Sequence, residues 1–179
     1  MDHYIPKRRV NVRYWCADRG EAEGHVFLDL DPAGRSHQTL LARLNAPTRF
    51  LPVANGPEGG VELVSRSSLV RVAPGEGVLQ SDVFARGFAP SRESDAEVWL
   101  LDGSTVRGRV WMPLERPSQR LSDFMNQRGR DFFVLLHGCE IQLVNAAAVA
   151  RLSLAESAGP PFAPSVREMS GRVGSAVLH

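Results

Sequence analysis

Arginines that could bind an anionic partner gather in one stretch of the chain. Six arginines and one tryptophan make up this candidate set: Arg107, Arg109, Trp111, Arg116, Arg120, Arg128 and Arg130. A guanidinium presents parallel N–H donors that match carboxylate or phosphate oxygens, and a buried tryptophan can anchor a protein interface. Because acidic residues are interspersed, an acidic protein surface suits the set better than nucleic acid does. The competing interpretation is a solvated face of mixed charge.

Few other residues have the types and spacing that catalysis or metal binding requires. The chain has no G-x-S-x-G motif and no histidine that recurs beside a nucleophile in both halves. His137 and Cys139 flank Gly138 and could face the same side of a strand, but two ligands without a third make a poor metal site. We therefore expect a protein that is not an enzyme and that needs no metal or cofactor. Cys16 and Cys139 are expected to be reduced, buried thiols.

The charge balance bears on the class of partner. The 179 residues carry 21 Lys and Arg against 20 Asp and Glu, a formal charge of +1. Nucleic-acid binding draws most of its affinity from neutralised phosphates, so this balance does not favour it. No apolar run reaches the roughly 18 residues of a membrane span, and the first residues lack a secretory signal. We expect a cytoplasmic protein, without a membrane interaction, that binds a protein partner or a second copy of itself.

The sequence contains one unit twice, starting near Gly24 and again near Gly108. This repeated unit must position the candidate arginines. The matched positions are mostly apolar or turn-forming: Val26 with Val110, Leu40 with Leu121, Leu44 with Met125, Asn45 with Asn126, Phe50 with Phe132, Gly56 with Gly138, Leu63 with Leu143, and Leu69 with Val149. One arginine pair, Arg71 with Arg151, is also retained. The two copies share core and turn residues but no reactive group. This pattern predicts a duplicated structural unit without a duplicated catalytic site.

Each repeat reads as five short strands with one short helix. The opening hairpins are expected at 10–30 and 96–112, the second with a turn at Asp102-Gly103 that tolerates a positive φ. The helices follow, with Ser36 or Ser118 as the N-cap. Asn45 and Asn126 then stand where a helix needs a left-handed C′ residue. Three further strands complete each repeat.

These elements predict a mostly β protein made of two tandem SH3-like or Sm-like small barrels, each with one short helix. The expected boundaries are 1–72 for the first barrel, 73–95 for a linker with an apolar anchored middle, 96–154 for the second barrel and 155–179 for a flexible tail.

Two family resemblances cover the repeats. The segment VWLLDGSTVRGRVWM resembles the opening of an Sm-like domain, and QLVNAAAVARLSL resembles its closing strands. That resemblance implies a small barrel and, as an alternative function, RNA binding. The combination of RLSDFMN, a Phe-rich strand and a closing LVN-x4-V segment is similar to an uncharacterised bacterial tandem-repeat family, and it implies no particular activity.

A third resemblance concerns the N-terminal region. Arg9 and Arg13 form R-x3-R, and Asp29 to Gly34 reads D-x-D-x2-G. The pair resembles the PilZ receptors, and it implies cyclic-di-GMP binding by Arg9, Arg13, Asp29 and Gly34. Asp31 stands where that family has serine and places a negative charge beside the implied phosphate site. The expected function is thus a non-catalytic protein-interaction or adaptor module in a bacterial cytoplasm, with the cyclic-di-GMP receptor and the Sm-like RNA binder as alternatives.

Overall fold

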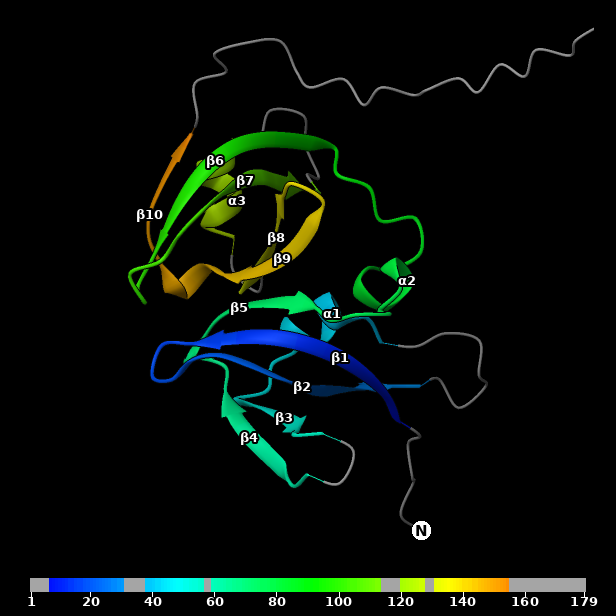
Figure 1. The fold of residues 1–179 in the computed structure, drawn as a ribbon. Helices are drawn as coiled ribbons and strands as arrows, with labels where there is room; N and C mark the ends of the chain where they lie inside the picture. Colours follow the sequence, from blue (N-terminus) through cyan, green and yellow to red (C-terminus); the bar gives the residue numbers. More distant parts are fainter. Residues whose placement is uncertain (1–6, 31–37, 57–58, 114–119, 128–130, 155–179) are drawn as a thin grey trace, which may run out of the picture.

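The computed structural model describes residues 7–30, 38–56, 59–113, 120–127 and 131–154, and this part of the chain is mostly β (Figure 1). Its strands form one antiparallel sheet in the order β10-β6-β7-β8-β9-β5-β1-β2-β3-β4. They are β1 (Lys7–Cys16), β2 (Gly20–Asp29), β3 (Phe50–Ala54), β4 (Val61–Ser65), β5 (Leu69–Pro74), β6 (Arg92–Leu100), β7 (Thr105–Met112), β8 (Phe132–His137), β9 (Glu140–Asn145) and β10 (Val149–Leu154). The predicted β-rich class is confirmed. The expected tail, 155–179, lies outside the described residues.

The two opening hairpins follow from alternating side chains. In β1 the even-numbered Val10, Val12 and Tyr14 are at most 2% exposed, while their odd-numbered neighbours face outward. Strands β1 and β2 pair from Lys7↔Asp29 to Cys16↔Gly20, and β6 and β7 form the matching hairpin. A period of two is what a strand with one buried face requires. Gly103 has a φ of +84°, which confirms the predicted positive φ in the β6–β7 turn.

The duplication extends to irregularities of the backbone. Each repeat has the same internal order, β5-β1-β2-β3-β4 or β10-β6-β7-β8-β9. Trp15 faces Arg71 in the first repeat and Trp99 faces Arg151 in the second, each beside a register shift. In both pairs the guanidinium carbon lies 3.9 Å from a ring centroid of the tryptophan. The arginine pair that survives in both copies is therefore explained by a cation–π stack on the sheet.

A glycine in each repeat allows two strands to cross closely. A Cβ added at Gly108 would stand 2.2 Å from the carbonyl oxygen of Leu136, and one added at Gly24 would stand 2.5 Å from Val53 Cγ1 and 3.1 Å from a backbone oxygen. A strand glycine of this kind marks a close approach of backbones. The second strand of each repeat can bend toward the third because this position has no side chain.

Short helices cover one side of each repeat: α1 (Leu40–Leu44) and α3 (Leu121–Met125). The helix of each repeat is confirmed, and Thr39 is the N-cap of α1, its hydroxyl accepting from Ala42 N–H at 3.2 Å. The predicted caps Ser36 and Ser118 lie outside the described residues. Asn45 and Asn126 are not left-handed as predicted; they are C-caps with φ of −91° and −93°.

The asparagine of the first repeat has a different role. Asn45 donates its side-chain N–H to the carbonyl oxygen of Phe132 at 3.1 Å and accepts the Phe132 N–H at 2.9 Å. It thus satisfies both backbone groups of a residue in the other repeat. Asn45 also donates its side-chain N–H to the carbonyl oxygen of Leu41 at 3.1 Å, so it caps its own helix and binds the other repeat.

The repeats join edge to edge, so the predicted barrels are not closed. Strand β5 pairs with β1 of its own repeat and, on its other side, with β9 of the second repeat, through Arg71↔Val144 and Val72↔Leu143. Figure 1 shows β5 and β9 meeting between the two halves, with β4 and β10 at opposite ends. The backbone groups that barrel closure needs on β5 and β9 are used by the junction, which leaves one continuous sheet.

The core is shared across this junction. One apolar cluster belongs mainly to the first repeat but includes Phe132, Val134 and Leu143, and the other belongs to the second repeat but includes Val70. Asn145 is 3% exposed and donates to the carbonyl oxygens of Arg66 at 3.1 Å and Leu69 at 2.7 Å. Apolar burial and satisfied polar groups both hold the repeats together.

The segment predicted as a linker is partly structured. It holds the helix α2 (Gln80–Val83), which the sequence did not indicate. Asp82 is 1% exposed and accepts a hydrogen bond from Arg8 at 2.8 Å. Phe84 is buried and stacks on Phe88 with centroids 4.7 Å apart, whereas Leu79 is 60% exposed. The expected apolar anchor is present, with Phe84 in the core cluster of the first repeat and Phe88 packed against it. In the described part of the chain no helix is long and apolar enough to span a membrane.

Candidate partner-binding groove

Opposite charges face one another on the outer side of the second repeat. The register of β6 and β7 places Glu97 opposite Arg107 and Asp95 opposite Arg109. Arg107 lies 2.9 Å from Glu97, and Arg109 lies 2.9 Å from Glu93 and 3.4 Å from Asp95. These side chains share a face because residues two apart on a strand point the same way.

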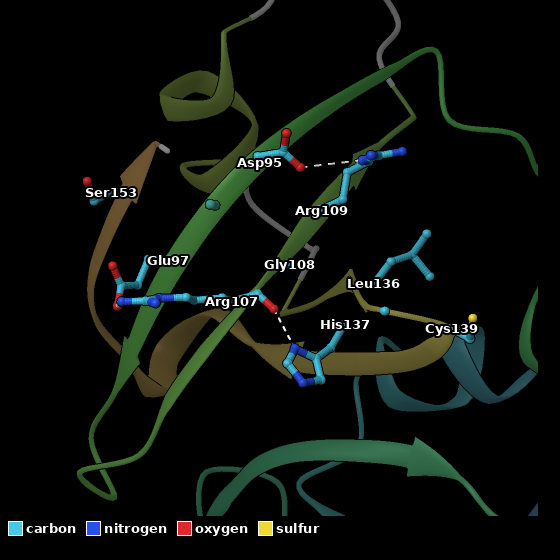
Figure 2. Close-up of a pocket in the computed structure, with 11 residues that line it drawn as sticks. Asp95, Glu97, Arg107, Gly108, Arg109, Leu136, His137, Cys139 and Ser153 are labelled. Atoms are coloured by element: carbon cyan, nitrogen blue, oxygen red, sulfur yellow. Dashed lines mark hydrogen bonds and ion pairs between the residues drawn. The ribbon is translucent and has the colours of Figure 1, made fainter. Parts of the chain in front are cut away.

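Four of these charged residues line an open groove with a volume of about 910 Å³: Asp95, Glu97, Arg107 and Arg109. Figure 2 shows Asp95 and Glu97 on one strand, Arg107 and Arg109 on the next, and Leu136 and Cys139 beyond them. Leu136 lies on the face of β8 opposite to Phe133 and Leu135, which belong to the core of the second repeat. Phe132 and Val134 share its face but are buried in the cluster of the first repeat, whereas Leu136 is half-buried and lines the groove. The groove therefore combines charged walls with an apolar residue and an exposed turn at its end.

A second depression of about 790 Å³ continues past the same turn. It shares Leu136, Gly138 and Cys139 with the first groove and reaches Trp111 and Arg13. The indole of Trp111 packs against the linker, with its ring centroid 5.9 Å from that of Phe84. An extended ligand could follow both depressions, because they meet at the turn between β8 and β9.

The electrostatics of the groove are set by ion pairs. The pKa of Arg109 is raised from its ordinary value, chiefly by its hydrogen bond to Glu93, against a smaller opposing effect of burial. The arginine stays charged, but Glu93 and Asp95 neutralise it locally. A strongly anionic ligand such as a phosphate would have to displace these carboxylates, so the groove suits a ligand with charges of both signs.

The predicted arginine set is only partly brought together. Arg107, Arg109 and Trp111 lie on β7, where the first two line the groove and the third lines the adjoining depression. Arg120 precedes α3, and its backbone N–H donates to Asp123 at 3.0 Å. The remaining members, Arg116, Arg128 and Arg130, lie outside the described residues.

The residues that the PilZ resemblance singled out are engaged elsewhere. Arg13 pairs with Glu140 and lies 3.8 Å from Glu21, and its guanidinium lies 5.6 Å from the ring centroid of Trp15. Arg9 lies over the ring of Phe27 at 5.5 Å.

Asp29, the acidic member of that motif, pairs with Lys7, and Gly34 lies outside the described residues. Among the described members of the motif, Arg13 is in ion pairs that a phosphate ligand would have to replace, whereas Arg9 stacks on an aromatic ring.

The histidine and cysteine beside the groove do not form a metal site in the described ranges. His137 Nδ1 lies 2.6 Å from the carbonyl oxygen of Arg107, as the dashed line in Figure 2 marks. No three His, Cys, Asp or Glu side chains gather as metal ligands among the described residues. The ring is therefore oriented by a backbone group of the neighbouring strand.

The two cysteines differ in a way that the sequence did not predict. Cys16 is buried, as expected, but Cys139 is exposed in the β8–β9 turn, which contradicts the prediction of two buried thiols. The turn needs Gly138 at a φ of +61°, and it carries Cys139 out to the solvent.

We expect the two thiols to differ in reactivity. Burial is the main cause that raises the pKa of Cys16 above its ordinary value, which keeps it protonated. A thiol reagent at mildly alkaline pH should therefore modify one equivalent of thiol in the folded protein and two in denaturant. Peptide mapping should place the first label on Cys139. Rapid labelling of Cys16 without denaturant would contradict its burial.

Sequence reasoning missed the acidic half of the groove. Glu93, Asp95 and Glu97 alternate along β6, and their outward position was legible from the alternation with Ala96 and Val98. Their pairing with arginines depends on the hairpin register, which could have been counted back from the Asp102-Gly103 turn. The apolar wall at Leu136 had no such signal, because FFVLLH is apolar throughout.

Comparison with protein-family models, curated proteins and solved structures finds no match to this chain.

Proposed function

We propose that this chain is a non-catalytic protein-interaction or adaptor module that binds an extended segment of a partner protein in the groove on β6, β7 and β8. The observation that carries the proposal is the row of ion pairs, Arg107 with Glu97 and Arg109 with Glu93, beside the outward-facing Leu136. Such a surface offers hydrogen-bond donors and acceptors of both signs to a peptide, together with one apolar contact. A cytoplasmic setting belongs to the same proposal.

The duplicated scaffold supports a binding role. We propose that each repeat is an opened relative of the SH3-like or Sm-like unit, since its strands follow the order β5-β1-β2-β3-β4 and the equivalent order in the second repeat. The repeats differ at one position that lines the groove. Leu136 in the groove corresponds to Ala54, which is 2% exposed in the first repeat. A difference on the surface above a shared core is typical of a scaffold that carries one specialised binding face.

The proposal is tested by affinity capture with matched variants. The tagged wild-type chain should retain a specific partner, and Leu136→Asp or Arg109→Glu should reduce its recovery by about tenfold, the effect of losing about 1.4 kcal/mol. Leu101→Asp provides the control because Leu101 is 65% exposed and lies outside both depressions. Equal recovery by all variants would exclude the groove, and recovery of background proteins alone would count against the adaptor function.

Two binding assays separate the alternatives. Calorimetric titration with cyclic-di-GMP should give no heat, because Arg13 is paired with Glu140 and Asp29 with Lys7. Single-stranded RNA should show unchanged mobility at low salt, where phosphate contacts are strongest. Saturable heat that is lost in Arg9→Ala and Arg13→Ala would favour the receptor. A mobility shift with steep salt dependence would favour the RNA binder.

A further inference from the structure

The junction between the repeats buries a specific apolar face of the second repeat. Phe132, at the start of β8, is 2% exposed, and Leu143, on β9, is fully buried. Both belong to the cluster formed mainly by the first repeat, and Ile141 packs against it. The first repeat covers this face with β5 and with α1, whose Asn45 binds the backbone of Phe132.

The first repeat presents the equivalent face to solvent. Phe50, Val61 and Leu63 correspond to Phe132, Ile141 and Leu143 by the repeat alignment and by the matching β3–β4 and β8–β9 ladders. They are 43%, 59% and 62% exposed. They account for half of the six large hydrophobic residues that are exposed in the described part of the chain, and all three lie on β3 and β4. Exposed apolar side chains on an edge strand mark a surface that can pair with another strand.

The opposite end of the sheet carries the equivalents of the covering elements. Strand β10 corresponds to β5, and its outer edge has no neighbour in the sheet formed by the described residues. Asn126 corresponds to Asn45 but is exposed, and within the described ranges its side-chain N–H bonds only inside its own helix, to the Ser122 carbonyl at 2.7 Å. The β4 end of the molecule therefore exposes the equivalent of the apolar face that is buried at the junction. The β10 end exposes the equivalents of β5 and Asn45, which cover that face within the chain.

The charges at the two ends are complementary. At the junction Arg71 donates to Gln142 Oε1 at 3.0 Å across β5 and β9. The equivalents are Arg151 on β10 and Glu62 on β4, so an amide acceptor at the junction is replaced by a carboxylate at the free edge. Glu62 already accepts from Arg19 at 2.6 Å, and its side chain remains 38% exposed. Its free lone pairs can accept from a second arginine.

We propose that this chain assembles head to tail with a second copy of itself, with β10 of one copy pairing antiparallel to β4 of the next in the register of the internal β5–β9 junction. Arg151 then faces Val64, and Leu152 faces Leu63, as Arg71 faces Val144 and Val72 faces Leu143 within the chain. The contact joins two different surfaces, so it repeats from copy to copy. It closes into a ring where the rotation allows and otherwise extends as a filament.

Cysteine cross-linking tests both the partner and the register. In a Cys139→Ser background, Leu63→Cys and Leu152→Cys are made in separate chains and mixed under mild oxidation. Opposed residues of antiparallel strands have Cα atoms about 4.5–5.5 Å apart, within the range for a disulfide. The mixture should give a cross-linked dimer, while each variant alone should give at least tenfold less. Leu101→Cys replaces Leu152→Cys in the control mixture, because it is exposed on the same repeat but lies outside β10.

The outcomes are distinguishable. A dimer formed by Leu63→Cys alone would show β4 pairing with β4 and overturn the proposal, as would equal cross-linking with the Leu101→Cys control. A wild-type chain that remains monomeric in sedimentation up to high concentration would also overturn it. Leu63→Lys should shift the wild-type assembly to monomer and Leu101→Lys should not, since a lysine on an edge strand opposes pairing. The test is independent of partner binding in the groove.

Discussion

Replacing Leu143 by alanine is expected to lower the free energy of unfolding by about 2–5 kcal/mol, the range found for a leucine truncated in a closed core. Leu143 is fully buried where the repeats meet, and it lies opposite Val72 of the other repeat. The truncation removes apolar contacts with the first repeat and leaves a cavity at the junction. Urea denaturation followed by tryptophan fluorescence measures the change.

The internal repeat supplies the matched control for this variant. Leu63 occupies the same position on β4 but is 62% exposed. In dilute solution, where single chains prevail, Leu63→Ala should change the free energy of unfolding by less than about 0.5 kcal/mol. Equal losses for the two variants would contradict a junction built on β5 and β9.

Gly108→Ala is expected to destabilise the fold by about 1–3 kcal/mol, the usual cost of forcing extra atoms into a packed site. Its Cβ would stand 2.2 Å from the backbone oxygen of Leu136. Backbone cannot rotate away as a side chain can, so β7 and β8 must separate and their pairing must weaken. The change should also alter the groove, because Gly108 and Leu136 both line it.

Two glycines serve as controls for this variant. Gly24→Ala in the first repeat should cost less than Gly108→Ala, since its closest obstacle is the Val53 side chain. Gly60→Ala should be nearly neutral, because a Cβ at this position would meet nothing within 4 Å and its φ is not positive. Thermal unfolding of the three variants gives the ranking, and a Gly108→Ala variant as stable as Gly60→Ala would refute the close approach.

The parts of the fold that depend on local sequence pattern could be predicted from the sequence. Alternation in β1 and the Asp102-Gly103 turn identify the hairpins, and the repeat identifies equivalent strands before any contact is known. What could not be predicted depends on contacts between distant segments. The sequence predicts Asn45 as a local helix cap, but it gives no sign that the same side chain also binds Phe132 in the other repeat. The open sheet was missed for the same reason, because strand composition does not specify whether an edge pairs within its repeat or across the junction.

The candidate site was predictable in part. Composition identifies the arginines of β7, but their ion pairs with the acidic residues of β6 depend on the hairpin register. Leu136 is only half-buried, although the four preceding residues of β8 are buried, because the cover that the junction gives to Phe132 and Val134 does not extend fully over it. The hairpin register could have been counted from the Asp102-Gly103 turn, but the pairing of strand edges across the junction needs three-dimensional information.

The central claim is that the two repeats form one sheet through β5 and β9. Proton–proton nuclear Overhauser effects in the isotope-labelled chain test it most directly. Cross-strand signals between the backbone protons of Arg71 and Val144, and of Val72 and Leu143, are the predicted result. Signals confined to the β1–β5 and β8–β9 ladders, with none between the repeats, would contradict it.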